Sequence, residues 1–187
     1  EKQGVPFARI GSRDPGPGIP ITMDDEGSAR RATQMLVELG HKRIGFIAGA
    51  KEYSLSQRRV DGWQDVMKEQ GLSVRGLLRQ GDFSHQSGLV AARALLDRAD
   101  RPSAIIASSD QMALATLVIA EDMGLEVPRD LSVISFDNSP AIRYATPSIT
   151  AVDQPIAETI SRAVELIIGM QRGSDAPAEP IRISGDL

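Results

Sequence analysis

Short apolar segments alternate with longer amphipathic segments along almost the whole chain. The apolar segments are the expected strands, at residues 5–10, 21–23, 43–48, 77–80, 104–107, 131–136, 149–152 and 181–184. Amphipathic helices are expected at residues 25–39, 55–70, 84–98, 111–123 and 155–170. Strands that alternate with helices of this length are typical of βαβ units, whose right-handed crossovers cover a mainly parallel sheet. The sequence therefore predicts an α/β fold with helices on both faces of a parallel sheet.

The two ends of the chain fit this pattern less well. The strand at residues 5–10 has no upstream partner, and the helix at residues 155–170 follows a joint that contains Pro147. The chain also begins with Glu1 instead of an initiator methionine. We therefore expect a processed product or a fragment of a longer protein, with ends that belong to a second, mostly missing lobe.

Composition argues against several classes of protein. The 187 residues include no cysteine and two histidines far apart in sequence, so neither a disulfide framework nor a zinc site is expected. No apolar run approaches the roughly 20 residues of a membrane span, and the net charge of −4 does not favour nucleic acid or an anionic membrane as a partner. Phosphate-loop and nucleophile-elbow motifs are absent. We predict a protein that is not an enzyme and needs no metal, cofactor or membrane.

Polar side chains follow two of the expected strands at the point where each strand ends. Ser109 and Asp110 come directly after one strand, and Asp137 ends the next. The carboxyl ends of parallel strands meet at one edge of a sheet, where open α/β sheets bind ligands. Asp110 is expected to cap the following helix, with Ser109 facing the ligand. Asp137 could form a turn, but its carboxylate also suits vicinal hydroxyls, and we predict a ligand contact.

Arginine and aromatic side chains near other strand ends are further candidates. Arg58 and Arg59 lie early in a helix, where the dipole disfavours cations. A solvated helix face and the binding of paired oxygens are both compatible with this arginine pair. Trp63 is expected in the core or in an interface, and Phe83 either stacks on a ligand or packs in the core.

The motifs together resemble the effector-binding core of the lactose-repressor (LacI/GalR) family of bacterial transcription regulators. The segments that carry the resemblance are Asp24–Gly27, Leu39–Gly49, Arg59–Trp63, Ser109–Ala113, Val133–Asp137 and Thr150–Pro155. They appear in the order and at the spacing of the family, across nearly all of the chain. The resemblance implies a periplasmic-binding-protein-like fold of two lobes, with crossovers near Thr22, residues 151–153 and Gly173.

The same resemblance divides the chain into four parts. Residues 1–22 would be a remnant of the N-terminal lobe, and residues 23–150 a nearly complete C-terminal lobe. Residues 151–173 would return to the N-terminal lobe as a crossover and helix. Residues 174–187 would add a closing strand to the C-terminal lobe.

Effector contacts carried over from the family are Arg59, Phe83, Ser109, Asp137 and Gln154. Arg59 would clasp hydroxyls or carboxylates, Phe83 would stack, Asp137 would accept hydroxyl hydrogen bonds and Gln154 would face the cleft. The sequence departs from the family at Ser109, where asparagine is usual. It also has Gly11 and Ser12 where some members have a carboxylate.

The implied function is that of a cytoplasmic sensor. A small effector, most simply a neutral or weakly charged sugar, would bind between the lobes of a homodimer and change operator affinity allosterically. The helix-turn-helix of the family is absent, so operator DNA would be bound only through a missing N-terminal domain. The alternative is a periplasmic solute-binding protein of a sugar transporter, which has the same fold.

Overall fold

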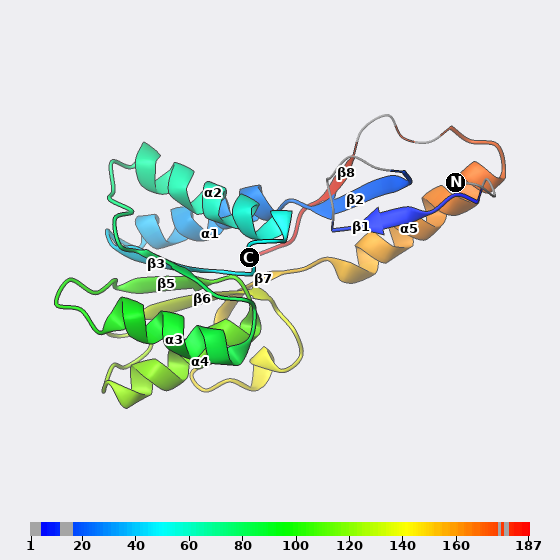
Figure 1. Cartoon of the computed structure of the whole chain (residues 1–187). Helices are drawn as coiled ribbons and strands as arrows, with labels where there is room; N and C mark the ends of the chain where they lie inside the picture. The colour runs from blue at the N-terminus through cyan, green and yellow to red at the C-terminus, as the bar shows by residue number, and fades with distance from the viewer. Residues whose placement is uncertain (1–4, 12–16, 176, 178–179) are drawn as a thin grey trace. The chain divides into compact units, whose positions relative to one another are not determined.

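The chain folds into two compact units in a computed structural model that describes residues 5–11, 17–175, 177 and 180–187 (Figure 1). The larger unit comprises residues 25–153 and 186–187. The smaller unit comprises residues 1–24 and 154–185. The chain therefore passes between the units three times, near residues 24, 153 and 185. Three crossovers are the number that the resemblance implies.

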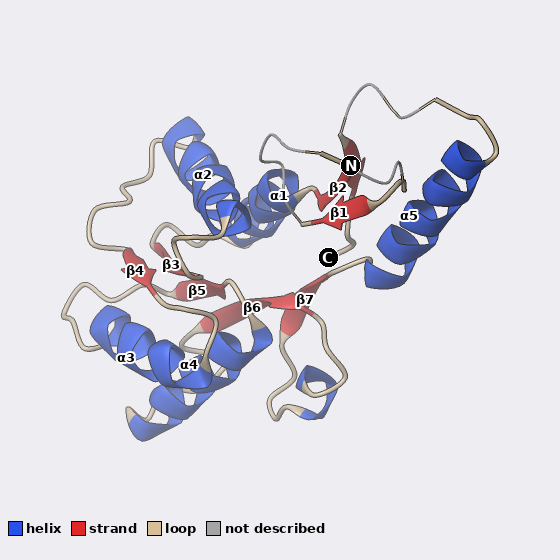
Figure 2. Ribbon diagram, turned by 45° about the vertical axis from the view of Figure 1, so that its right-hand side comes forward, coloured by secondary structure: helices blue, strands red, loops and turns tan. Residues whose placement is uncertain are grey.

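Five parallel strands form the sheet of the larger unit (Figure 2). They are β3 (Ile44–Ala48), β4 (Leu78–Gln80), β5 (Ala104–Ala107), β6 (Ser132–Asp137) and β7 (Thr150–Asp153), in the order β4-β3-β5-β6-β7. In register, Phe46 lies beside Leu78 of β4 and Ile106 of β5, and Ile106 lies beside Ile134 of β6. The predicted parallel α/β sheet is confirmed.

Two pairs of helices cover this sheet. Helices α1 (Asp25–Glu38) and α2 (Ser54–Glu69) pack together on one face, and α3 (His85–Leu96) and α4 (Asp110–Asp122) pack together on the other (Figure 1). All residues of β3 and β5 are buried. Burial on both faces explains why these strands are continuous apolar runs instead of alternating apolar and polar residues.

Trp63 of α2 lies in the core of the larger unit, one of the two positions expected for it. Its ring is fully buried and lies 5.5 Å from the ring of Phe46, centroid to centroid. The indole Nε1 donates a hydrogen bond to the Ile44 carbonyl at 3.2 Å, which satisfies the one polar atom of this side chain. Trp63 therefore fixes α2 against the first residues of β3.

The described residues of the smaller unit form a three-stranded parallel sheet and one helix. Strands β1 (Ala8–Ile10), β2 (Ile19–Met23) and β8 (Ile181–Ile183) are arranged in the order β1-β2-β8, and the helix is α5 (Ile156–Gln171). Its core consists of Ile19, Ile21, Ala163 and Ile183. Residues 1–4, 12–16, 176 and 178–179 lie outside the described residues, and Ser12 is one of them.

The closing strand differs from its predicted position. It was expected to join the larger sheet after a crossover near Gly173, but β8 pairs with β2, with Ile181 beside Ile21 and Ile183 beside Met23. The physical reason is the core of the smaller unit, because Ile183 packs against Ile21 there. The third crossover follows β8, where the Asp153 amide donates to the carbonyl of Asp186 at 2.8 Å.

Candidate functional site

The carboxyl ends of the five strands form one edge of the larger sheet. In this sheet β4 lies on one side of β3, and β5, β6 and β7 lie on the other side of β3. This order, second-first-third-fourth-fifth, is that of a doubly wound sheet with a topological switch point between β3 and β5. Ligands bind at the carboxyl side of such switch points. Gly49 after β3 and Ser108 after β5 lie at this position.

Arg59 is buried beside the switch point and is held by an ion pair. Its Nε donates to Asp25 Oδ1 at 2.9 Å, and its Nη1 donates to the Ser108 carbonyl at 2.8 Å. The guanidinium carbon lies 4.3 Å from the centre of the Phe136 ring, a cation–π distance. Arg59 therefore connects α2 with the beginning of α1 and the ends of β5 and β6.

Arg58 shares the same carboxylate. Its Nη2 donates to Asp25 Oδ2 at 3.0 Å, and its Nη1 donates to Ser54 Oγ at 3.0 Å. Asp25 thus offsets two cations in the first turns of α2, where the helix dipole disfavours positive charge. The alternative that these two arginines lie on a solvated helix face is wrong, because the Arg58 side chain is only 11% exposed.

Asp25 is the central residue that sequence reasoning missed. In the sequence it stood out only within the segment Asp24–Gly27, which carries the family resemblance. A signal was present, since two adjacent arginines early in a helix require a nearby negative charge. The sequence gives no distance between α1 and α2, however, so the partner could not be chosen among the acidic residues.

Two buried polar atoms near the switch point have no hydrogen-bond partner among the described residues. They are Ser108 Oγ and Arg58 Nε. A buried donor or acceptor without a partner costs about 1–3 kcal/mol. Such atoms persist where another requirement, such as ligand binding, retains them.

Ser109 takes the capping role that was predicted for Asp110. Ser109 has the extended backbone of an N-cap, and its Oγ accepts from the Met112 amide at 3.3 Å. The same hydroxyl donates to the Phe83 carbonyl at 3.0 Å. The prediction that Asp110 caps α4 was wrong: Asp110 is buried, and accepts hydrogen bonds from Ser135 Oγ and the Ser139 amide. It thereby fixes the turn after β6.

Phe83 is half-buried beside the switch point. Its ring meets the ring of Tyr53 edge-on at 6.0 Å between centroids, and it packs partly against the core. A Cβ atom on Gly49 would lie 1.9 Å from this ring, so only glycine fits at that position. Phe83 also has a φ of +72°, in the left-handed region that is rare for a bulky residue. Such local strain is concentrated at functional sites.

Asp137 and Asn138 form the turn at the end of β6. Their φ angles are +104° and +53°, so two consecutive non-glycine residues have left-handed backbone. Asn138 Nδ2 donates to Asp153 Oδ1 at 3.1 Å, which connects this turn to the end of β7. Asp137 is partly exposed at the same edge.

The five predicted contacts are divided between the two units. Arg59, Phe83, Ser109 and Asp137 all lie at the carboxyl edge of the larger sheet, whereas Gln154 belongs to the smaller unit.

The nearby Asp82 is ionised well below neutral pH, since hydrogen bonds, above all from the Ser84 hydroxyl, lower the pKa of its carboxyl to about 2. The edge therefore carries negative charge, hydroxyl groups and aromatic surface together.

Neither a metal site nor a membrane span is found in the described part of the chain. The described acidic and histidine side chains do not gather in groups that could hold a metal ion. No described helix is both long enough and apolar enough to cross a membrane.

Residues 33–187 match the family model of the periplasmic binding protein-like domain. The chain is 34% identical to the HTH-type transcriptional regulator CelR of Thermobifida fusca, over 98% of the chain and 54% of that protein. It is 35% identical to catabolite control protein A of Priestia megaterium, over 89% of the chain and 51% of that protein. The chain thus spans about half the length of the curated relatives it matches.

Solved structures agree with these sequence relatives. A regulatory protein of the LacI family from Chloroflexus aggregans superposes with a TM-score of 0.91 at 28% identity, covering 98% of this chain and 67% of that one. The complex of the transcriptional regulator CelR with cellobiose superposes with a TM-score of 0.85 at 33% identity, covering 97% and 56%. These relatives are transcription regulators and not enzymes. The chain belongs to the LacI family of transcription regulators and covers part of their periplasmic-binding-protein-like, effector-binding domain.

Proposed function

We propose that the carboxyl edge of the larger sheet binds a sugar-like effector and that this binding regulates a transcription regulator of which the chain is the sensing part. The observation that carries the proposal is the Ser108 hydroxyl, which is buried at the switch point and has no hydrogen-bond partner among the described residues. A ligand hydroxyl could supply both a donor and an acceptor to such groups. The solved complex of the regulator CelR with cellobiose supports a sugar as the class of effector.

Each proposed contact has chemistry that suits a sugar. The Asp137 carboxylate accepts hydrogen bonds from adjacent hydroxyls, and Phe83 offers an aromatic face to the apolar face of a sugar ring. The Ser109 hydroxyl already donates to Phe83 and accepts from Met112, which leaves one lone pair for a ligand. Arg59 acts mainly by holding Asp25 and Ser108 in place, with its remaining N–H donors available to the effector. Gln154 stays a prediction that rests on the family resemblance.

The experiment is a thermal-shift screen of this chain against cellobiose, monosaccharides, sugar phosphates and nucleosides. A ligand at about 100 times its dissociation constant stabilises the folded state by about 2.7 kcal/mol. Stabilisation by a sugar supports the proposal. Stabilisation by nucleosides alone would contradict the sugar class, and no stabilisation by any member of the panel would contradict the sensor function of this chain.

We also propose that the exposed side of α4 mediates homodimer formation. A cavity of about 680 Å³ lies along this helix, and much of its lining is apolar, with Leu114, Leu117 and Val118 from α4 and Leu125 and Val127 from the following loop. The Val118 side chain is 44% exposed in the single chain. Light scattering of Val118→Asp tests this proposal: a shift from dimer to monomer supports it, and a wild-type chain that is monomeric at high concentration contradicts it.

In the whole regulator, effector binding would change operator affinity through a DNA-binding domain outside this chain. Such coupling requires that the effector has different affinities for two arrangements of the protein. The proposal places the regulator in the cytoplasm, where its operator is. In this scheme the chain contributes the sensor, and DNA is contacted by the separate DNA-binding domain.

A further inference from the structure

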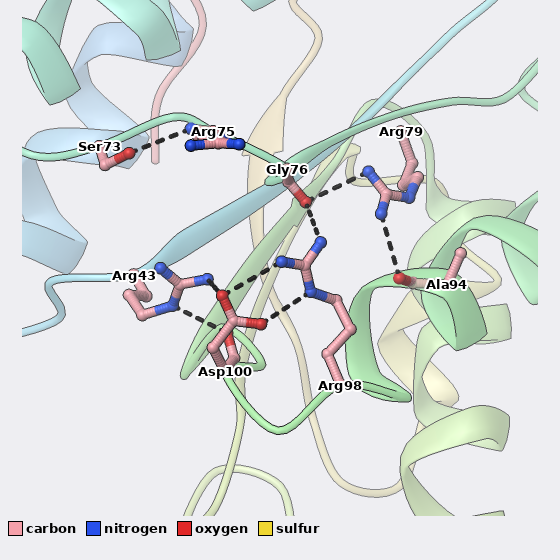
Figure 3. Close-up of polar contacts among 8 residues, drawn as sticks. All are labelled: Arg43, Ser73, Arg75, Gly76, Arg79, Ala94, Arg98 and Asp100. Carbon is pink, nitrogen blue, oxygen red and sulfur yellow. Dashed lines mark hydrogen bonds and ion pairs between the residues drawn. The ribbon is translucent and has the colours of Figure 1, made fainter.

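A group of arginines lies at the amino edge of the five-stranded sheet, the edge opposite to the proposed effector site (Figure 3). Arg43 immediately precedes β3, Arg75 lies in the loop between α2 and β4, and Arg98 lies between α3 and β5. Together with Ser73, Gly76 and Asp100, they line a cavity of about 500 Å³. We propose that this cavity, the arginine pocket, binds a small phosphate-bearing anion.

The charge of the arginine pocket is unbalanced. Asp100 is the one carboxylate among its described lining residues, which include three arginines, and it pairs with two of them, Arg43 and Arg98. Arg43 Nη2 donates to Asp100 Oδ2 at 2.8 Å, and Arg98 Nε donates to Asp100 Oδ1 at 2.9 Å, so Asp100 lies between the two arginines (Figure 3). Arg43 and Arg98 thus share the negative charge of Asp100. The three arginines and one carboxylate of the lining leave two positive charges in excess, which matches a phosphate monoester dianion.

Arg43 and Arg98 are held in place before any ligand binds. Arg43 Nε also donates to the Asp100 carbonyl at 2.8 Å, and Arg98 Nη1 donates to the Gly76 carbonyl at 3.1 Å. The hydrogen bond with Asp100 raises the pKa of Arg98 and lowers the pKa of Asp100, so both side chains stay charged. Fixed guanidinium groups lose little conformational entropy when they bind an anion.

Further cationic groups have no negative partner among the residues that the structure describes. Arg79 Nη1 donates to the same Gly76 carbonyl as Arg98, at 3.2 Å, and its other acceptors are also neutral carbonyls, those of Leu78 and Ala94 (Figure 3). Two guanidinium groups therefore converge on one uncharged oxygen. The exposed Arg75 guanidinium donates to no acceptor within the described ranges, and its planar fork suits two oxygens of a phosphate.

Ser73 adds a neutral donor. Its Oγ accepts a hydrogen bond from the Arg75 amide at 3.2 Å, which leaves its O–H free to donate into the arginine pocket. The volume of about 500 Å³ is within the usual range for small-molecule sites. The proposal is independent of the proposed sugar site, because it uses other residues at the other edge of the sheet.

The test is an NMR titration of this chain with inorganic phosphate and, separately, with glucose 6-phosphate. The amide signals of Ser73 and Gly76 are expected to shift and to saturate. Arg75→Gln is expected to weaken binding by about tenfold, equivalent to about 1.4 kcal/mol. Lys68→Gln is the matched control, since Lys68 is an exposed cation on α2 that does not line the arginine pocket, and it should bind like the wild type.

The two ligands separate the two sources of phosphate. Equal affinity for both supports a site for the free phosphate group, and tighter binding of glucose 6-phosphate supports a site for a phosphate monoester. The proposal is overturned if neither ligand gives saturable shifts at Ser73 and Gly76, or if Arg75→Gln and Lys68→Gln weaken binding equally. Shifts confined to the amides of Ser108 and Asp137 would also overturn it, because binding would then occur at the effector edge.

Discussion

The buried ion pair between Asp25 and Arg59 leads to a strong prediction about stability. The two side chains are 2% and 3% exposed, and the Asp25 carboxylate also accepts from Arg58. Removing the carboxylate leaves two cations in a poorly hydrated place. The loss of one partner of a buried pair costs about 3–5 kcal/mol. We expect Asp25→Ala to lower the free energy of unfolding by this amount, out of the about 5–15 kcal/mol typical of a folded protein.

Urea denaturation followed by circular dichroism measures this loss. The matched control is Asp65→Ala, because Asp65 pairs with Arg30 at 3.4 Å but its side chain is 53% exposed. An exposed pair contributes about 0–1 kcal/mol, so the control should unfold at nearly the wild-type urea concentration. The reasoning is refuted if Asp25→Ala and Asp65→Ala destabilise the chain equally.

A double-mutant cycle separates the ion pair from other effects of the substitution. Arg59→Met alone leaves Asp25 with Arg58, and the combination of Arg59→Met with Asp25→Ala removes both charges of the pair. The double variant should lose less unfolding free energy than the sum of the two single losses, by about 1 kcal/mol or more, because residues in contact are coupled. Additive costs would mean that the pair does not account for the stability lost.

Three further predictions concern the carboxyl edge. Gly49→Ala should destabilise the chain by about 1–3 kcal/mol in thermal denaturation, because its Cβ would displace the Phe83 ring. Ser109→Ala should cost about 1 kcal/mol in urea denaturation through the lost cap of α4, whereas an unchanged midpoint would exclude the capping role. The pKa of Asp82 is depressed from 3.8 to about 2, so its contribution to stability is present above pH 3.8 and is lost as the pH falls towards 2. Asp82→Asn should therefore flatten the acid side of a stability–pH curve measured by urea denaturation, and an unchanged slope would contradict this assignment.

The sheet and the edge of the site could be predicted because both follow from local patterns. Continuous apolar runs mark β3 and β5 as strands buried on both faces, and parallel strands place all their polar carboxyl ends together. These inferences need no knowledge of which helix lies beside which.

The contacts that could not be predicted join segments distant in sequence. The pairing of Asp25 with Arg59 depends on the packing of α1 against α2, and the hydrogen bonds of Asp110 depend on the turn after β6. The position of β8 was missed for a similar reason. A short strand such as Ile181–Ile183 fits either sheet by its alternation, and only the packing of Ile183 against Ile21 decides between them.

The central claim is that the carboxyl edge of the larger sheet binds a sugar-like effector. Its most direct test is a calorimetric titration with the sugar that stabilises the chain most in the thermal screen. Three proteins are titrated: the wild type, Asp137→Asn and the control Asp122→Asn. Asp122 lies at the end of α4, paired with Arg93 on the surface. A hydrogen bond to a charged group contributes about 1.5–3 kcal/mol, so Asp137→Asn should weaken binding by at least about tenfold while the control binds normally. Equal affinity of all three proteins would contradict the account.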